Sequence, residues 1–270
     1  MNKELLKSFF IVFLFILVSI PSVLNAPQQR AEELEKQRLT EEQNKILIEE
    51  KRTYLLGKFD PILHKDFVKI PLKFTVARTE MYLRREAYDA FVEMRIGAMQ
   101  DGITLNIASA ARNFDYQKGL WENKWNGITF VDGKNLSESI PDGLGRFKKI
   151  LEYSAAPGTS RHHWGTDIDL GGADTLYFNS EKGKKEYEWL TQNAPLFGFC
   201  QTYNLKGSNR PTGYNEERWH WSYLPLARIF TEEYKNLIQQ KDILGFAGDA
   251  QVSNLNLINE YILSINPDCI

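Results

Sequence analysis

The chain has 270 residues, of which 43% are hydrophobic, and its formal net charge is −2. This length suits one domain of ordinary size with additional segments. Because positive and negative charges nearly balance, the chain has neither the basic excess typical of a nucleic-acid-binding protein nor the acidic tract of a disordered tail.

Residues 1–26 have the pattern of an export signal. Two lysines precede a hydrophobic run of secretory-signal length, and Ala26 offers a small residue for cleavage. Because Pro27 disfavours a cut directly before it, an uncleaved N-terminal anchor is the alternative. We therefore expect an exported protein, periplasmic or in the cell envelope, with a membrane tether if the segment stays uncleaved.

Three further segments follow. Residues 27–53 carry Glu and Lys at helical spacing, which predicts a solvated helix that could act as a stalk. The main domain is expected at residues 54–225. Apolar residues at helical spacing over 229–240 and 253–265 predict a C-terminal helical extension at residues 226–270.

Hydrophobic periodicity predicts short strands alternating with helices in the main domain. Residues 126–145 are rich in Gly, Asp, Asn and Ser and are expected to form a loop. Ser180 is expected to cap a helix. The expected helices cover residues 82–100, 114–125 and 180–193, and the expected strands cover residues 103–109, 167–170 and 219–223.

Three of the four histidines lie beside carboxylates in two short segments. Catalytic zinc takes three ligands from His, Asp, Glu or Cys and keeps a position for water, and a base must lie within reach of that water. We expect His162, Asp169 and His220 to hold Zn²⁺. Glu217 would then activate the water, and Gly165 would let the backbone turn between His162 and Asp169.

The second segment makes a geometric demand. Aromatic residues alternate over 219–223, which indicates a strand. In an ideal strand Glu217 and His220 would point to opposite faces. The chain must therefore bend near Glu217, or Glu217 must precede the strand.

Together the segments resemble motifs of the VanY-type D-alanyl-D-alanine carboxypeptidase family of zinc peptidases. Ser-x-His-x-x-Gly-x-x-x-Asp begins at Ser160, and Glu-x-Trp-His-x-x-Tyr begins at Glu217. A third segment, beginning at Ser109, resembles the family's Ser-x-x-Arg-x-x-x-x-Gln motif. The resemblance covers about residues 80–225.

Two departures from the family pattern concern the metal segments. Asp167 stands where the family more often has a small apolar residue, and Arg218 stands where it often has Pro. Asp167 could compete with Asp169 as a ligand, and His163 could compete with His162. The family spacing favours His162 and Asp169.

The resemblance implies an α+β fold, in which a small, largely antiparallel sheet is flanked by helices, as in zinc D,D-peptidases and Hedgehog-like domains. It also implies the zinc ligands and the Glu217 base given above, so that residues 54–225 would be a zinc peptidase domain. Arg112 is implied to stabilise an oxyanion or to grip the substrate. The implied substrate-binding residues are Ser109, Gln117, Ser160 and Tyr223.

The implied activity is zinc-dependent hydrolysis of the C-terminal D-Ala-D-Ala bond of peptidoglycan stem peptides. The alternatives on the same fold are an L,D-carboxypeptidase and a peptidoglycan endopeptidase. A more distant alternative is a non-catalytic zinc-fold module that binds the cell wall, which the presence of Glu217 disfavours. No nucleic-acid partner is expected, and the sequence does not determine the oligomeric state.

The two cysteines, Cys200 and Cys269, do not form a disulfide framework. In an oxidising compartment they could form one bridge, which would tie the C-terminal segment to the main domain. The alternative is that both cysteines are free thiols, because the sequence does not tell how far apart the two sulfurs lie.

Overall fold

The computed structural model describes residues 26–270, which divide into two units that meet between Ile48 and Glu49. In the first unit, residues 26–48 form most of helix α1 (Ala26–Leu55), and their side chains are exposed throughout. The predicted solvated helix is thus observed, while its use as a stalk stays a prediction. The predicted export signal lies, except for Ala26, outside the described residues. No helix within residues 26–270 is long and apolar enough to cross a membrane.

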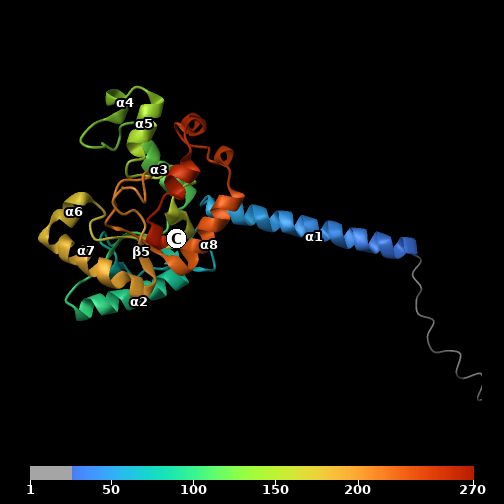
Figure 1. Cartoon of the computed structure of the whole chain (residues 1–270), viewed down its shortest axis with the longest axis horizontal. Coiled ribbons are helices and arrows are strands. Elements are labelled where there is room, and N and C mark those ends of the chain that lie inside the picture. The colour runs from blue at the N-terminus through green and yellow to red at the C-terminus, as the bar shows by residue number, and fades with distance from the viewer. Residues whose placement is uncertain (1–25) are drawn as a thin grey trace, which may run out of the picture. The chain divides into compact units, whose positions relative to one another are not determined.

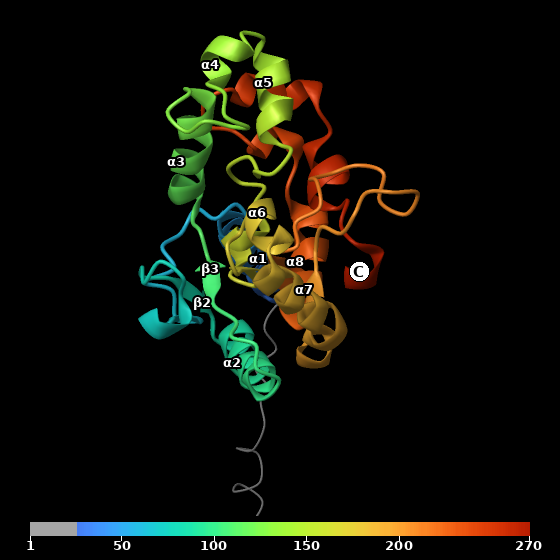
Figure 2. The same cartoon turned by 90° about the vertical axis from the view of Figure 1, so that its left-hand side faces the viewer.

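The second unit, residues 49–270, contains short strands with helices around them (Figures 1 and 2). Four strands form an antiparallel sheet in the order β3-β4-β6-β5, and β1 pairs with β2 in a separate antiparallel sheet. The predicted α+β fold with small antiparallel sheets is confirmed. The strands are β1 (Phe67–Lys69), β2 (Tyr82–Arg84), β3 (Ile107–Ser109), β4 (Asp167–Leu170), β5 (Phe199–Gln201) and β6 (His220–Tyr223).

Helices lie on one face of the sheet and at one end of this unit. Helices α2 and α7 pack on the same apolar core as the sheet. Helices α3, α4 and α5 gather at one end in both views (Figures 1 and 2). The helices are α2 (Arg85–Gln100), α3 (Phe114–Trp125), α4 (Leu136–Ser139), α5 (Gly143–Ile150), α6 (Thr175–Asn179), α7 (Glu181–Asn193) and α8 (Leu224–Leu237).

The two central strands separate an apolar side from a polar side. Ile168 and Trp221 lie in the core with α2 and α7. Because side chains alternate along a strand, the residues that flank Ile168 on β4 and Trp221 on β6 point to the opposite face of the sheet. The register pairs Asp167 with Ser222 and Asp169 with His220 across β4 and β6. This pairing brings the polar side chains of two distant sequence segments together on one face.

Three expectations about local structure are wrong. Residues 82–84, the start of the helix expected over 82–100, form strand β2. The expected loop at residues 126–145 contains the short helix α4. The expected helix at residues 253–265 is replaced by a 3-10 turn at Asp249–Asn254 and a π turn at Ile258–Ile262. Asn side chains compete with the helical backbone for hydrogen bonds, and Asn254 bonds to the side chain of Gln251 at 3.1 Å.

The compact unit is wider than the predicted main domain at both ends. It begins at Glu49 rather than at residue 54. The last turns of α1 are held by an ion pair between Arg52 and Asp242 at 2.8 Å and by another between Lys51 and Glu233. Residues 226–270, expected as an extension, supply buried side chains to the same unit: Tyr234, Ile243, Phe246, Leu257, Ile262 and Ile265.

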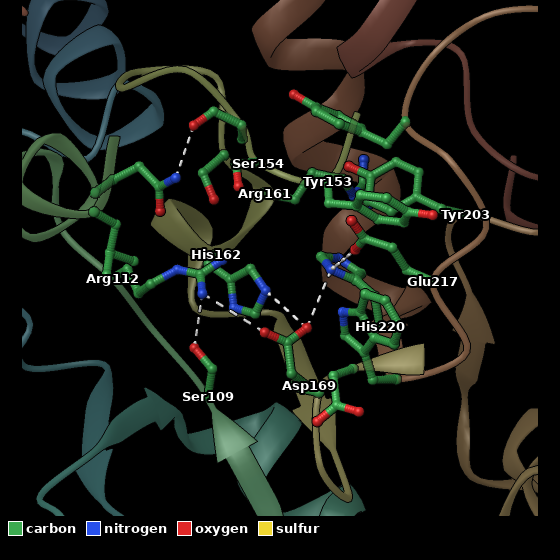
Figure 3. A pocket seen from close by; sticks show the side chains of 18 of the residues that line it. Ser109, Arg112, Tyr153, Ser154, Arg161, His162, Asp169, Tyr203, Glu217 and His220 are labelled. Atoms are coloured by element: carbon green, nitrogen blue, oxygen red, sulfur yellow. Dashed lines mark hydrogen bonds and ion pairs between the residues drawn. The ribbon is translucent and has the colours of Figure 1, made fainter. Parts of the chain in front are cut away.

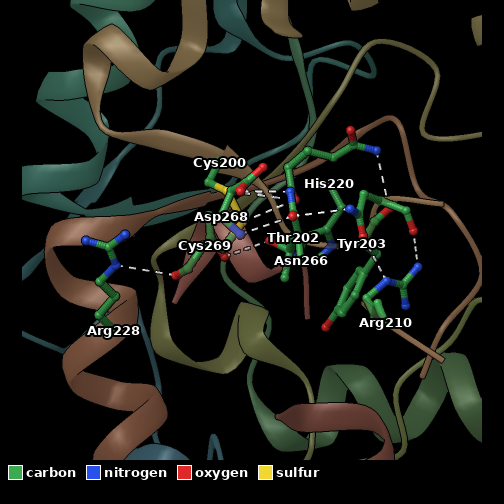
Figure 4. The surroundings of a disulfide bond; sticks show 12 residues. Cys200, Thr202, Tyr203, Arg210, His220, Arg228, Asn266, Asp268 and Cys269 are labelled. Atoms are coloured by element: carbon green, nitrogen blue, oxygen red, sulfur yellow. Dashed lines mark hydrogen bonds between the residues drawn. A yellow bond between two sulfur atoms is a disulfide. The ribbon is translucent and has the colours of Figure 1, made fainter. Parts of the chain in front are cut away.

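A disulfide joins Cys200 on β5 to Cys269 near the C-terminus (Figure 4). The Cα atoms lie 5.7 Å apart, and both residues are buried. Asn266, beside the bridge, donates from Nδ2 to the carbonyl of Gln201 at 3.1 Å. The C-terminal segment is therefore tied to the edge of the sheet, which resolves the alternatives that the sequence left open.

We expect loss of this bridge to lower the free energy of unfolding by about 4 kcal/mol, because it closes a long loop in the unfolded chain. The bridged residues are 69 positions apart. Denaturant unfolding of the parent with and without reductant measures the effect. The double variant Cys200→Ser/Cys269→Ser is the control, since its midpoint should match that of the reduced parent and ignore reductant. A parent midpoint that does not move with reductant would contradict the expectation.

Candidate metal centre

His162, Asp169 and His220 come together on the polar side of the sheet (Figure 3). One donor atom from each lies within 4.8 Å of the others. Nε2 of His162 and Nδ1 of His220 each lie 3.3 Å from Oδ1 of Asp169. All three residues are buried. The structure thus brings together the three ligands that the sequence predicts.

The local backbone explains this convergence. His162 lies in a 3-10 turn, Arg161–Trp164, which Gly165 ends with a positive φ of 70°. A Cβ at this position would lie 2.4 Å from the ring of Phe67, so only glycine fits. The chain then enters β4, which carries Asp169. Gly165 therefore makes the turn between the first two ligands, as expected.

The protonation of His162 suits a metal ligand. Its Nδ1 lies 2.8 Å from the carbonyl oxygen of Ala110, which can only accept, so Nδ1 carries the proton. Nε2 is left with its lone pair. Burial, followed by the Arg112 guanidinium, lowers the pKa of His162 and favours the neutral ring.

Two donor atoms at this centre lack a partner. Within residues 26–270, Nε2 of His162 and Oδ1 of Asp169 are buried without a hydrogen bond. A buried polar group left unpaired costs about 1–3 kcal/mol. A divalent cation would satisfy both atoms together with His220, and two imidazoles with one carboxylate are a donor set that zinc accepts. These residues therefore fit Zn²⁺.

Asp167 supports His220 and does not join the ligand cluster. Its Oδ2 lies 2.9 Å from Nε2 of His220, which leaves Nδ1 of that ring for the cluster. Arg161 donates to the same carboxylate at 3.1 Å, Thr166 donates at 2.7 Å, and Ser222 donates as well. Burial alone would raise the pKa of Asp167, but Arg161 and His220 hold it below its usual range. Metal-binding histidines commonly donate the N–H of their other ring nitrogen to a carboxylate in this way.

His163 has no nitrogen free for a metal. Its Nδ1 lies 2.6 Å from the carbonyl oxygen of Arg112, and its Nε2 accepts from the backbone N–H of Gly158 at 3.0 Å. Burial lowers the pKa of His163 to about 3, so the ring is neutral. His163 therefore joins two loops, and the competition with His162 that the sequence left open is resolved.

Glu217 meets the geometric demand made by the strand pattern. β6 begins at His220, and the backbone N–H of His220 bonds back to the carbonyl of Glu217 at 3.3 Å. This turn places Oε2 of Glu217 3.3 Å from Nδ1 of His220. Burial raises the pKa of the Glu217 carboxyl. A carboxylate beside the ligands, with a raised pKa, suits proton transfer.

A cavity of about 440 Å³ contains the ligand cluster and most of the predicted substrate residues. Arg112 donates to Oγ of Ser109 at 2.9 Å and lies 3.6 Å from Oδ2 of Asp169. Gln117 donates to a backbone carbonyl at 2.7 Å, while its Oε1 is buried without a partner within residues 26–270. The predicted residues that line the cavity are Ser109, Arg112, Gln117, Ser160, Glu217 and the three ligands.

Tyr223 is the predicted substrate residue that the structure does not bring to this cavity. It lies at the end of β6, and its ring packs on Phe199 with the centroids 5.5 Å apart. Tyr223 is three residues from His220, so strand alternation turns its side chain to the opposite face. Its position is that of a packing residue at the edge of the core.

Comparison with known proteins decides the family. Residues 80–226 match the VanY family, described as D-alanyl-D-alanine carboxypeptidase. The chain belongs to this family. The resemblance seen in the motifs is thereby confirmed.

Two curated proteins are similar to this VanY-family chain. An uncharacterized protein of Haemophilus influenzae is 34% identical over an alignment of 122 residues, and the match covers 38% of this chain and 90% of that protein. The putative carboxypeptidase YodJ of Bacillus subtilis is 26% identical over an alignment of 186 residues, and the match covers 67% of this chain and 60% of that protein.

Solved structures with some likeness include the LD-carboxypeptidase LdcB, at 24% identity and a TM-score of 0.46, covering 68% of this chain and 81% of LdcB. Another is the D,D-pentapeptidase VanY from a VanB-type vancomycin resistance cassette, in complex with Zn(II). Its identity is 21% and its TM-score 0.44, and the match covers 66% of this chain and 94% of that one.

Several residues of this VanY-family cavity are not apparent from the sequence motifs. Tyr203 packs its ring 4.8 Å from the ring of His220. Asp167 does not line the cavity, and the sequence offered it only as a rival ligand, two residues before Asp169 on the same face of a strand. The further cavity residues include Lys124, Tyr153, Ser154, Tyr214 and Trp219.

Proposed function

We propose that this chain is a zinc carboxypeptidase that hydrolyses the C-terminal D-Ala-D-Ala bond of peptidoglycan stem peptides. The observation that carries the proposal is the buried pair of unpartnered donors on His162 and Asp169, joined by His220 in a cavity with Glu217. Membership of the D-alanyl-D-alanine carboxypeptidase family supports the substrate class.

When bound by His162, Asp169 and His220, zinc supplies Lewis acidity toward the scissile carbonyl and the attacking water. Glu217 takes a proton from that water and passes it to the amine that leaves. Its raised pKa, caused by burial, helps it to hold the proton between the two transfers.

Three further side chains bind the substrate. Arg112 is held by Ser109 and by the carboxylate of Asp169, and its Nε is buried without a partner within residues 26–270. In this proposal the guanidinium stabilises the developing oxyanion. The free Oε1 of Gln117 accepts a hydrogen bond from an N–H of the peptide, and the hydroxyl of Ser160, which also lines the cavity, binds a polar group of the substrate.

The proposed substrate class supports a location in the cell envelope. The pattern of residues 1–26 supports export, and the exposed, charged helix α1 supports a stalk between a membrane anchor and the peptidase unit. The choice between a cleaved signal and an anchor is part of this proposal, and the size of the exported protein tests it.

Zinc analysis and peptide hydrolysis test the proposed function together. We expect purified protein to hold about one zinc ion per chain, and to release D-Ala from a stem pentapeptide that ends in D-Ala-D-Ala. A chelator should abolish release, and added zinc should restore it. Zinc binding with cleavage of tetrapeptides alone would indicate an L,D-carboxypeptidase, and cleavage of crosslinked dimers would indicate an endopeptidase. A folded protein without zinc or hydrolysis would refute the proposal.

A further inference from the structure

Helix α3 lines the cavity with residues from one of its faces. Gln117, Leu120 and Lys124 all border the cavity and are spaced three and four residues apart, which places them on one side of the helix. The ammonium of Lys124 donates to Oγ of Ser154, which also borders the cavity. A cationic side chain thus reaches the cavity that holds the ligand cluster.

Lys124 has no carboxylate partner among residues 26–270. Lys118 on the same helix pairs with Glu122 at 3.8 Å. Burial, followed by the Arg112 guanidinium, lowers the pKa of Lys124, and the Glu217 carboxylate offsets only part of this effect. Buried charges are normally paired, and an anion brought by a ligand would stabilise this one.

The two arginine side chains that line the cavity are already paired with carboxylates. Arg112 lies 3.6 Å from Asp169, and Arg161 lies 3.1 Å from Asp167. Of the three Lys and Arg side chains that line the cavity, Lys124 alone is without a carboxylate within residues 26–270.

The acids of the cavity are engaged as well. Asp169 and Glu217 lie against the histidines, each 3.3 Å from Nδ1 of His220. Asp132 pairs with Lys149 at 2.6 Å, and Asp174 accepts the N–H of Tyr177 at 2.7 Å. Within residues 26–270, none of these four acids forms an ion pair with Lys124, so a carboxylate on the substrate can serve as its counter-charge.

We propose that Lys124, held by Ser154, binds the free C-terminal carboxylate of the substrate and so selects carboxypeptidase over endopeptidase cleavage. This inference rests on the proposed function. Alanine has no polar side chain, so its carboxylate is the charged group that a carboxypeptidase must recognise on the leaving residue. Stem peptides also carry internal carboxylates on acidic residues, which share this chemistry.

Three pentapeptides distinguish these sources: the parent acid, its C-terminal amide, and a peptide with the internal carboxylates amidated. We expect the protein to hydrolyse the acid with a kcat/KM about ten- to a hundredfold above that of the C-terminal amide. Lys124→Met should lose this preference mainly through a higher KM, and Lys124→Arg should keep part of it. Internal amidation should affect the parent and Lys124→Met equally.

Lys118→Met is the matched control, because Lys118 lies on the same helix and does not border the cavity. It should retain the KM and the preference of the parent. The inference is overturned if Lys124→Met keeps the KM of the parent for the acid. It is also overturned if the loss follows internal rather than C-terminal amidation.

Calorimetric binding of the dipeptide D-Ala-D-Ala to the zinc-loaded protein separates this inference from the proposed function. If the parent hydrolyses no stem peptide, the proposed function fails. Binding that is about tenfold or more weaker in Lys124→Met than in Lys118→Met would still support the carboxylate site. Equal binding in the two variants, or no binding by the parent, would overturn it.

Discussion

Replacing Asp167 by asparagine should weaken zinc binding by about ten- to a hundredfold, although Asp167 is not a ligand. The carboxylate holds Nε2 of His220 at 2.9 Å and so presents Nδ1 to Asp169. The asparagine amide lacks the negative charge that holds the His220 ring. If its NH2 group faced Nε2 of His220, two hydrogen-bond donors would oppose each other. Competition with a chromophoric chelator measures the zinc affinity, and peptide hydrolysis at limiting zinc should fall in parallel.

The same change should also destabilise the fold. Arg161 is 1% exposed and would lose the carboxylate at 3.1 Å. Removing one partner of a buried ion pair costs about 3–5 kcal/mol. The double variant Asp167→Asn/Arg161→Met removes the unpaired charge, so it should regain part of the stability without regaining zinc affinity.

That contrast separates the two roles of Asp167. Denaturant unfolding of the chelated proteins reports stability, and chelator competition reports affinity. If Asp167→Asn binds zinc as tightly as the parent, the carboxylate does not orient His220. If the double variant regains zinc affinity along with stability, the effect on the metal was only a consequence of misfolding.

The ligand set could be predicted from the sequence because most of its geometry is local. His162 and Asp169 lie on either side of one glycine turn, and Glu217 and His220 on either side of another turn. The family motif records these spacings. Folding had only to bring two segments together, which the pairing of β4 with β6 does.

The hydrogen bonds that hold the ligands in position could not be predicted in the same way. Asp167 and His163 were rival ligands in the sequence because spacing does not tell which ring nitrogen is already bonded. Both questions are decided by partners distant along the chain, His220 for Asp167 and Arg112 for His163. The disulfide and the place of Lys124 depend on long-range packing as well.

The misplacement of Tyr223 has a different cause. The alternation that indicates a strand at residues 219–223 also turns Trp221 and Tyr223 away from His220. The structure shows this, with Trp221 in the core and Tyr223 packed against it. The motif placed Tyr223 near the substrate, whereas the periodicity of the same residues indicated the core.

Replacing Glu217 by glutamine should lower kcat by about a hundred- to ten-thousandfold, which is the usual contribution of a general base. Zinc content should stay the same, because Glu217 is not one of the three clustered ligands. KM should change little, since the amide keeps the shape of the side chain and removes its basicity. Steady-state hydrolysis and metal analysis on the same preparation measure both effects.

Glu216→Gln is the matched control. Glu216 is the neighbouring residue, pairs with Arg218 at 3.2 Å and does not border the cavity. It should turn over peptide at the rate of the parent. Undiminished turnover by Glu217→Gln would show that another group takes the proton from water. Loss of zinc from Glu217→Gln would instead give Glu217 a part in holding the metal, because its Oε2 lies 3.3 Å from the same nitrogen of His220 that faces Asp169.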